Sequence, residues 1–148
     1  MAFRFRLQAV LEHRRHLEDL ALNNYAQKLT AQRQCQQQID WLKQEHARAR
    51  AELQTKERQG MPAKDFILAN EYVTVLRLMA MREQSRLPLL EEEVREARDK
   101  LRQATIDRKV MESLRERHLA RWEREQLLNE QRLLDEAAVG AFVRRDEA

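Results

Sequence analysis

The chain has very little of what joins β-strands or closes a compact globule. Its 148 residues include two glycines, two prolines and one cysteine, and aromatic residues make up 5 %. Strands would need turns to connect them, and no sustained alternation of apolar and polar residues indicates strands. One cysteine excludes an internal disulfide and fits a reducing compartment. No apolar run reaches the 18 residues that could cross a membrane, and the opening MAFRFRLQAV lacks an apolar run sufficient for a signal peptide.

What the chain does contain is charge and regularly spaced apolar residues. Charged residues make up 36 % and hydrophobic residues 43 %, which is typical of a long helix or coiled coil when the apolar residues are spaced correctly. From Phe66 to Ala104, alternating steps of three and four select twelve positions. Eleven of them are apolar, where composition alone predicts about five. This spacing predicts the seam of a coiled coil.

Upstream, the same seam is less regular. It keeps its register at eight positions: Leu11, Ala21, Tyr25, Cys35, Ile39, Leu42, Ala49 and Leu53. Polar residues interrupt it at Arg14, Glu18, Lys28, Gln32 and His46. We expect Leu17, Leu22 and Leu29, which lie beside these gaps, to fill part of them.

The stretch KERQGMPAKD, residues 56–65, separates the two halves. Gly60 suits the left-handed end of a helix, and Pro62 suits the first turn of the next one. The sequence therefore predicts an all-α fold, in which two long helices form an antiparallel coiled-coil hairpin with an overhanging C-terminal helix. We expect a single domain over 1–148, with helix 1 at about 3–58, the hinge at 59–63 and helix 2 at about 64–143.

Pro88 lies inside the second helix. It removes one backbone hydrogen bond and favours a kink, because the seam keeps its register through the proline. The alternative is a true break, with Ser85 or Leu87 capping a third helix.

Motifs of catalysis and cofactor binding are missing. The sequence contains no glycine-rich phosphate loop, no CxxC and no HExxH motif. His13 and His16 stand three residues apart on one helical face, but no third metal ligand is near in sequence, so we interpret them as surface histidines. A single seam offers no concave pocket for a catalytic group. We expect no enzyme activity, no cofactor and no metal ion.

Charge and exposed apolar side chains predict two contact regions. Residues 95–124 carry ten basic and six acidic side chains, and a hairpin places them against the basic N-terminus. The open end is therefore expected to dock into an acidic cavity or onto nucleic acid, although few aromatics are available to stack bases. The stretch DFILANEYVTVLRLMAMRE is more apolar than one seam requires, so either it binds a partner or it packs against the end of helix 1. The overhang, with Leu127, Leu128, Leu134, Ala138 and Phe142, has the same excess.

Three stretches resemble the flagellar FliJ family: FRFRLQAVLEHRRHLEDLALNNYAQ, GMPAKDFILANEYVTVL and DRKVMESLRERHLARWEREQLLNEQRLLDEAAVGAFVRR. The resemblance spans nearly the whole chain. It implies a soluble, non-enzymatic component of the flagellar type III export apparatus, built like the central stalk of rotary ATP synthases. Its implied partners are the hexameric export ATPase, the cytoplasmic domain of the export gate and export chaperones. Its implied location is the cytoplasm, peripheral to the inner membrane at the flagellar base, with no direct membrane insertion.

The resemblance also implies where these partners bind. The ATPase would take the open end, which carries Arg4, Arg6, Arg14, Arg15, Arg115, Arg117, Arg121 and Arg124. The gate-binding face, carried over by position, would include Gln38, Leu42, Tyr72, Leu76 and Met79. Glu45, Ala49 and Glu83 stand where relatives are expected to have aromatic, aliphatic or histidine side chains. Two other functions remain open at this point: the equivalent stalk of a virulence secretion system, and a generic coiled-coil adaptor or nucleic-acid-binding hairpin.

Overall fold

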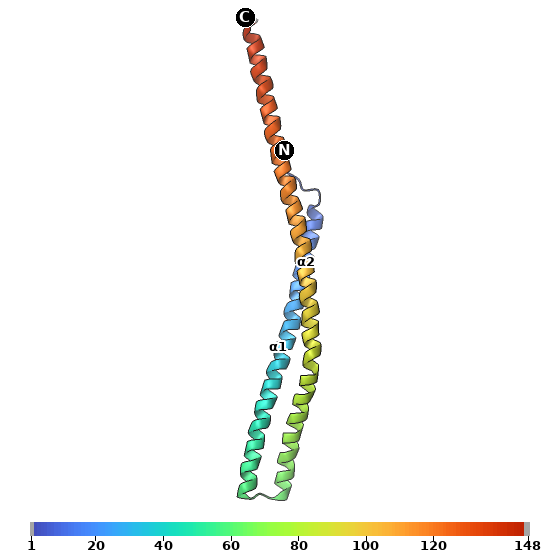
Figure 1. Cartoon of the computed structure of the whole chain (residues 1–148), viewed down its shortest axis with the longest axis vertical. Coiled ribbons are helices and arrows are strands. Elements are labelled where there is room, and N and C mark those ends of the chain that lie inside the picture. Colours follow the sequence, from blue (N-terminus) through green and yellow to red (C-terminus); the bar gives the residue numbers. More distant parts are fainter. Residues whose placement is uncertain (1, 147–148) are drawn as a thin grey trace. The chain divides into compact units, whose positions relative to one another are not determined.

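The structure, a computed structural model, describes residues 2–146. Within that range the chain forms two helices and no strand: α1 spans Gln8–Gln59 and α2 spans Ala63–Asp146 (Figure 1). The predicted all-α class and the hairpin packing are confirmed. Residues 1, 147 and 148 of the predicted domain lie outside the described residues. By its internal contacts the chain divides into two compact units: a hinge unit of residues 19–102, and an open-end unit of residues 1–18 and 103–148.

The turn of the hinge unit joins Gln59, the last residue of α1, to Ala63, the first of α2. Gly60 has a φ of +87°, and its amide donates to the carbonyl of Glu57 at 3.2 Å, so the left-handed glycine ends α1. The carbonyl of Pro62 accepts from the amides of Asp65 and Phe66, both at 3.1 Å, and starts α2. Asp65 lies in the first turn of α2 and Arg58 in the last turn of α1, where each charge complements the helix dipole.

The core of the hinge unit is the predicted seam. Every predicted seam position between residues 19 and 102 is buried or half-buried. Two clusters form its tightest parts. One joins Cys35 and Ile39 to Leu90, and the other joins Leu42 to Leu76 and Ala80. A two-helix seam is narrow, so each of these side chains supplies a large share of the apolar surface that folding removes from water.

Three of the five polar residues that interrupt the seam, Arg14, Glu18 and Lys28, form ion pairs across the two helices. In the hinge unit the ammonium of Lys28 lies 3.4 Å from the carboxylate of Glu93. In the open-end unit, Arg108 Nε donates to Glu18 Oε2 at 2.7 Å, and Arg14 lies 3.4 Å from Asp107. The expectation that leucines fill these gaps is wrong for Leu17 and Leu22, which are 36 % and 50 % exposed; Leu29 is half-buried. Opposite charges replace apolar contacts there.

Helix α2 is continuous through Pro88. The alternative of a third helix capped by Ser85 or Leu87 is therefore not the observed structure. Ser85 instead donates its hydroxyl to the carbonyl of Met81 at 3.0 Å, one turn back in the same helix. The proline ring takes the place of one backbone donor without interrupting the seam, because Leu87 and Leu90 both keep their covered positions.

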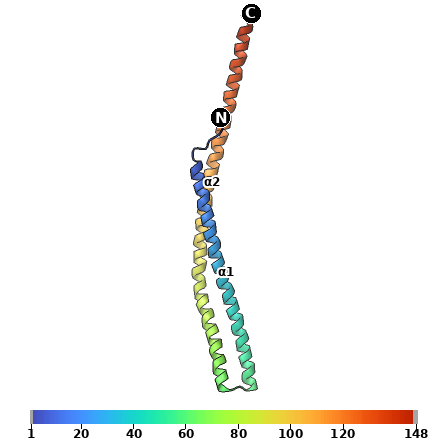
Figure 2. The same cartoon turned by 180° about the vertical axis from the view of Figure 1, so that it is seen from behind.

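The open-end unit differs from the prediction at its N-terminus. Helix α1 begins at Gln8 rather than near residue 3, and residues 2–5 form no regular secondary structure. Both views show this segment beside α2 (Figures 1 and 2). In extended chain residues i and i+2 point to the same side, whereas a helix turns them about 200° apart. Phe3 and Phe5 therefore both reach α2 only if the segment stays extended.

We predict that Leu42→Ala lowers the free energy of unfolding by about 2–4 kcal/mol, because it empties a fully buried position of a thin core. Urea denaturation followed by circular dichroism measures the change. The matched control is Leu89→Ala, whose side chain is 68 % exposed and which should change stability by about 0.5 kcal/mol or less. Equal losses for both variants would contradict the assignment of the core.

We also predict a pH dependence from the pair that Arg108 forms with Glu18. The hydrogen bond from Arg108 holds the pKa of Glu18 below its ordinary value of 4.5. A lowered folded-state pKa means that the stabilisation is complete above pH 4.5 and is lost as pH falls through the folded-state pKa. Glu18→Gln should therefore be less stable than wild type at pH 7, and the difference should shrink toward pH 3.

Thermal unfolding between pH 3 and 7 tests this dependence. The control is Glu116→Gln, because Glu116 is exposed and forms no ion pair among residues 2–146. A constant difference between Glu18→Gln and wild type over this pH range would show that the pair does not contribute.

Candidate binding surfaces

One face of α2 in the hinge unit carries exposed apolar side chains at helical spacing. Leu68, Tyr72, Val75 and Met79 follow one another at steps of four, three and four, which places them on one face. Their exposed fractions range from 45 % to 59 %. Because all four side chains are exposed, the alternative that they are local core is wrong for these residues. We call them the hinge-side surface.

A hydrogen-bonded cluster joins the hinge-side surface to α1. The hydroxyl of Tyr72 donates to Glu45 Oε1 at 3.1 Å, and the guanidinium of Arg48 donates to both oxygens of the same carboxylate. Arg48 and then Tyr72 hold the pKa of Glu45 below its ordinary value, and the nearby carboxylate raises the pKa of Tyr72. Glu45 thus accepts hydrogen bonds from Tyr72 on α2 and from Arg48 on its own helix.

The structure divides the residues predicted to bind the export gate. Gln38, Tyr72 and Met79 are exposed. Leu42 and Leu76 are 0 % and 3 % exposed and pack against each other in the seam. These two leucines support the surface from beneath and cannot touch a partner while the helices are paired.

An exposed tryptophan lies on α1 near Gln38 and Glu45. Trp41 is 52 % exposed and lies one turn before Glu45, and sequence reasoning missed it. The spacing of Trp41, three residues after Gln38 and four before Glu45, could have indicated that it lies on the same helical face as these residues.

Two other residues near this face have buried surroundings. Ala49 is half-buried against the Leu42 cluster, and Glu83 accepts the thiol hydrogen bond of Cys35 at 3.5 Å. Burial, and then this carboxylate, raise the pKa of the Cys35 thiol, so it remains a neutral core residue.

At the open end, aromatic contacts hold the extended N-terminal segment on α2. The rings of Phe3 and Trp122 have centroids 6.0 Å apart, and those of Phe5 and His118 are 5.6 Å apart with edge-to-face geometry. The guanidinium of Arg115 lies 6.0 Å from the centroid of Phe3. Phe5 is 5 % exposed, so this segment is anchored mainly by one buried ring and two aromatic pairs.

The eight arginines predicted for the open end have different surroundings. Arg4, Arg6 and Arg115 line one pocket of about 500 Å³ together with Phe3 and Phe5. Arg14 and Arg15 lie 3.4 Å from Asp107 and Glu112, so their charges are balanced within the unit. Three others follow α2: Arg117, which donates to Ser113 at 3.3 Å, and the exposed Arg121 and Arg124.

Beyond Trp122, α2 continues without a partner helix among the described residues of this unit. Its apolar side chains are open to solvent, and Leu134 and Phe142 are 70 % and 67 % exposed. Leu127 and Leu128 are 59 % and 53 % exposed. The predicted overhang is thus present, and its apolar side chains are exposed.

Other kinds of site find little support. Residues 2–146 hold no group of three or more histidine, cysteine, aspartate or glutamate side chains that could bind a metal ion, and His13 and His16 are both exposed. Neither helix contains, over its described length, a stretch apolar enough to cross a membrane.

The two long helices and their seam define a coiled-coil hairpin protein. The family model described as flagellar FliJ protein matches residues 3–147. The chain belongs to the flagellar FliJ family. A search of curated proteins and a search of solved structures each found no match.

Proposed function

We propose that the chain is a non-enzymatic component of the flagellar type III export apparatus, which engages the export ATPase through its open end and the export gate through its hinge-side surface. The family match over residues 3–147 carries this proposal. It also favours a flagellar system over a virulence secretion system, and a dedicated export protein over a generic adaptor. The surfaces described above supply the physical contacts.

The open end suits insertion into a ring-shaped ATPase. A ring has room for a coiled coil only along its axis, so the end that carries the N-terminus and the overhang must enter first. Arg4, Arg6 and Arg115 gather in one pocket there, and Arg121 and Arg124 extend the positive charge along α2. Attraction to an acidic ring interior would be screened as the Debye length falls from about 10 Å at 0.1 M salt to about 3 Å at 1 M.

The hinge-side surface suits the cytoplasmic domain of the export gate. This surface includes the exposed Tyr72 and Met79, and α1 adds the exposed Gln38 and Trp41. The hydrogen bond to Glu45 already orders the Tyr72 ring. An aromatic residue that is ordered before binding loses less conformational entropy in a complex. The protein would act at the cytoplasmic side of the inner membrane, at the flagellar base, without inserting into the bilayer. It would also escort export chaperones; no nucleic acid is required for any of these roles.

We predict that Tyr72→Ala combined with Met79→Ala weakens binding to the gate domain by at least tenfold and reduces swimming. Exposed side chains at a binding hot spot can each contribute about 2 kcal/mol or more. Isothermal titration calorimetry measures the affinity, and circular dichroism should show unchanged helix content. The control is Leu78→Ala with Leu89→Ala, which removes exposed apolar groups elsewhere on α2. Equal weakening by both double variants would remove the hinge-side surface from gate binding.

We further predict that reversing Arg4, Arg6, Arg115 and Arg121 to glutamate abolishes stimulation of ATP hydrolysis by the export ATPase, while gate binding survives. All four changed residues belong to the open-end unit. A phosphate-release assay measures stimulation. The charge-matched control reverses four exposed basic residues of the hinge unit: Arg33, Lys64, Arg82 and Arg98. Full stimulation by the open-end variant would exclude this end from the mechanism.

A further inference from the structure

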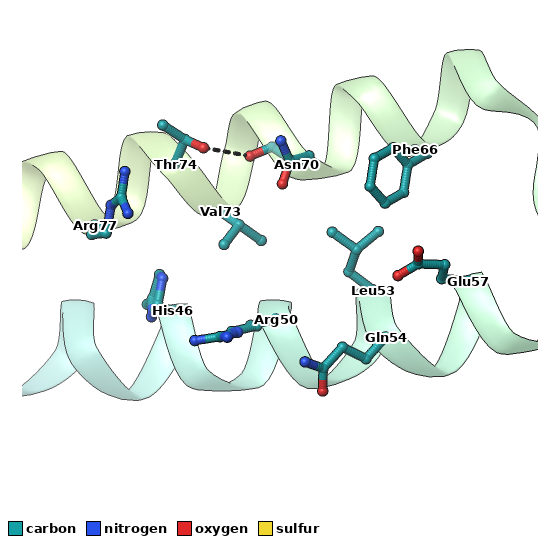
Figure 3. Close-up of a pocket in the computed structure, with 10 residues that line it drawn as sticks. All are labelled: His46, Arg50, Leu53, Gln54, Glu57, Phe66, Asn70, Val73, Thr74 and Arg77. Atoms are coloured by element: carbon teal, nitrogen blue, oxygen red, sulfur yellow. Dashed lines mark hydrogen bonds between the residues drawn. The ribbon is translucent and has the colours of Figure 1, made fainter.

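A groove lies between the two helices of the hinge unit near the turn. Its volume is about 310 Å³, and both helices contribute to it. Figure 3 shows Leu53, Val73 and Phe66 between the two ribbons, where they form an apolar floor. His46, Arg50 and Arg77 line the part farther from the turn, and Glu57 lines the part nearer to it.

The arginines of this groove have no partner within the unit. Neither Arg50 nor Arg77 forms an ion pair in the part of the chain that the structure describes, and both are exposed. By contrast Arg48, two residues before Arg50, is bound to Glu45 and Glu52. Two guanidinium groups from different helices thus line the same groove as an apolar floor, a combination that suits a carboxylate attached to an apolar group.

This groove is separate from the hinge-side surface. Tyr72, Glu45 and Arg48 line a different pocket, of about 210 Å³. Leu53 is the seam residue that lines both pockets, so the two open on opposite sides of the seam. Spacing agrees with this, because Arg50 and Arg77 occupy the positions that flank the seam on one side, and Glu45 and Tyr72 those on the other. A ligand in the groove would leave the Tyr72 ring free.

We propose that this groove, defined by Arg50, Arg77 and His46 over the floor of Leu53, Val73 and Phe66, is a docking site for an acidic segment of a protein partner. An aspartate or glutamate of that segment pairs with the two guanidinium groups, and an adjacent apolar residue covers the floor. Glu57 sets the orientation of the bound segment, because a carboxylate of that segment placed at the end of the groove nearer the turn would meet a like charge. The site does not depend on the proposed gate or ATPase contacts.

Fluorescence anisotropy with the full chain tests the proposal. The probe is a fluorescein-labelled amphipathic peptide whose charged positions are all glutamate and whose apolar positions are leucine. Arg50→Glu with Arg77→Glu should weaken its binding at least tenfold. The matched control, Arg33→Glu with Arg82→Glu, makes the same change of net charge at exposed positions of the same unit and should keep the affinity within about twofold.

Further arms of the experiment separate the possible ligands. A peptide with glutamine in place of glutamate should not bind, and Glu57→Gln should tighten binding of the acidic peptide because it removes the like charge. Tyr72→Ala with Met79→Ala should leave this binding unchanged, which distinguishes failure here from failure of the proposed gate contact. Equal weakening by both charge reversals would overturn the proposal. The proposal would also be overturned if a single-stranded oligonucleotide bound more tightly than the peptide and if Arg50→Glu with Arg77→Glu abolished the binding of that oligonucleotide.

Discussion

The seam between two antiparallel helices is the interaction on which the rest of this structure depends. A helix that packs against one other helix buries a single stripe of its surface, and only ten hydrophobic residues in the described part of the chain are buried. Three regions with exposed side chains lie beside this seam: the hinge-side surface, the arginine groove and the arginine-lined open end.

Polar residues within the seam select one alignment of the helices. Lys28 faces Glu93 in the hinge unit, and Arg108 faces Glu18 in the open-end unit. A shift of one helical turn would separate these charges and leave each partly covered without its counter-ion, which costs more than an exposed pair contributes. The alignment in turn places Glu45 under the hydroxyl of Tyr72 and Arg50 on the same groove as Arg77. The ion pairs that disturb the apolar pattern thus help to set which side chains meet across the helices.

Sequence periodicity predicted the helices, the turn at Gly60 and the seam, because each rests on local preference or on spacing along one chain. It could not assign Leu42 and Leu76, since a heptad position and a binding position can coincide in sequence and only packing shows which side chains are covered. The extended Phe3–Phe5 segment was missed because its fit depends on Trp122 and His118, more than a hundred residues away. The charge excess of the open end was predicted, but not that Asp107 and Glu112 neutralise Arg14 and Arg15.

If the open end engages the export ATPase and the hinge-side surface engages the export gate, as proposed, the protein can hold both partners at the same time. Size-exclusion chromatography with multi-angle light scattering, on a mixture of the chain with the export ATPase and the gate domain, tests it most directly. We predict one species that contains all three proteins, with the gate domain retained when the ATPase is in excess. Displacement of either partner by the other, so that only binary complexes form, would contradict the account.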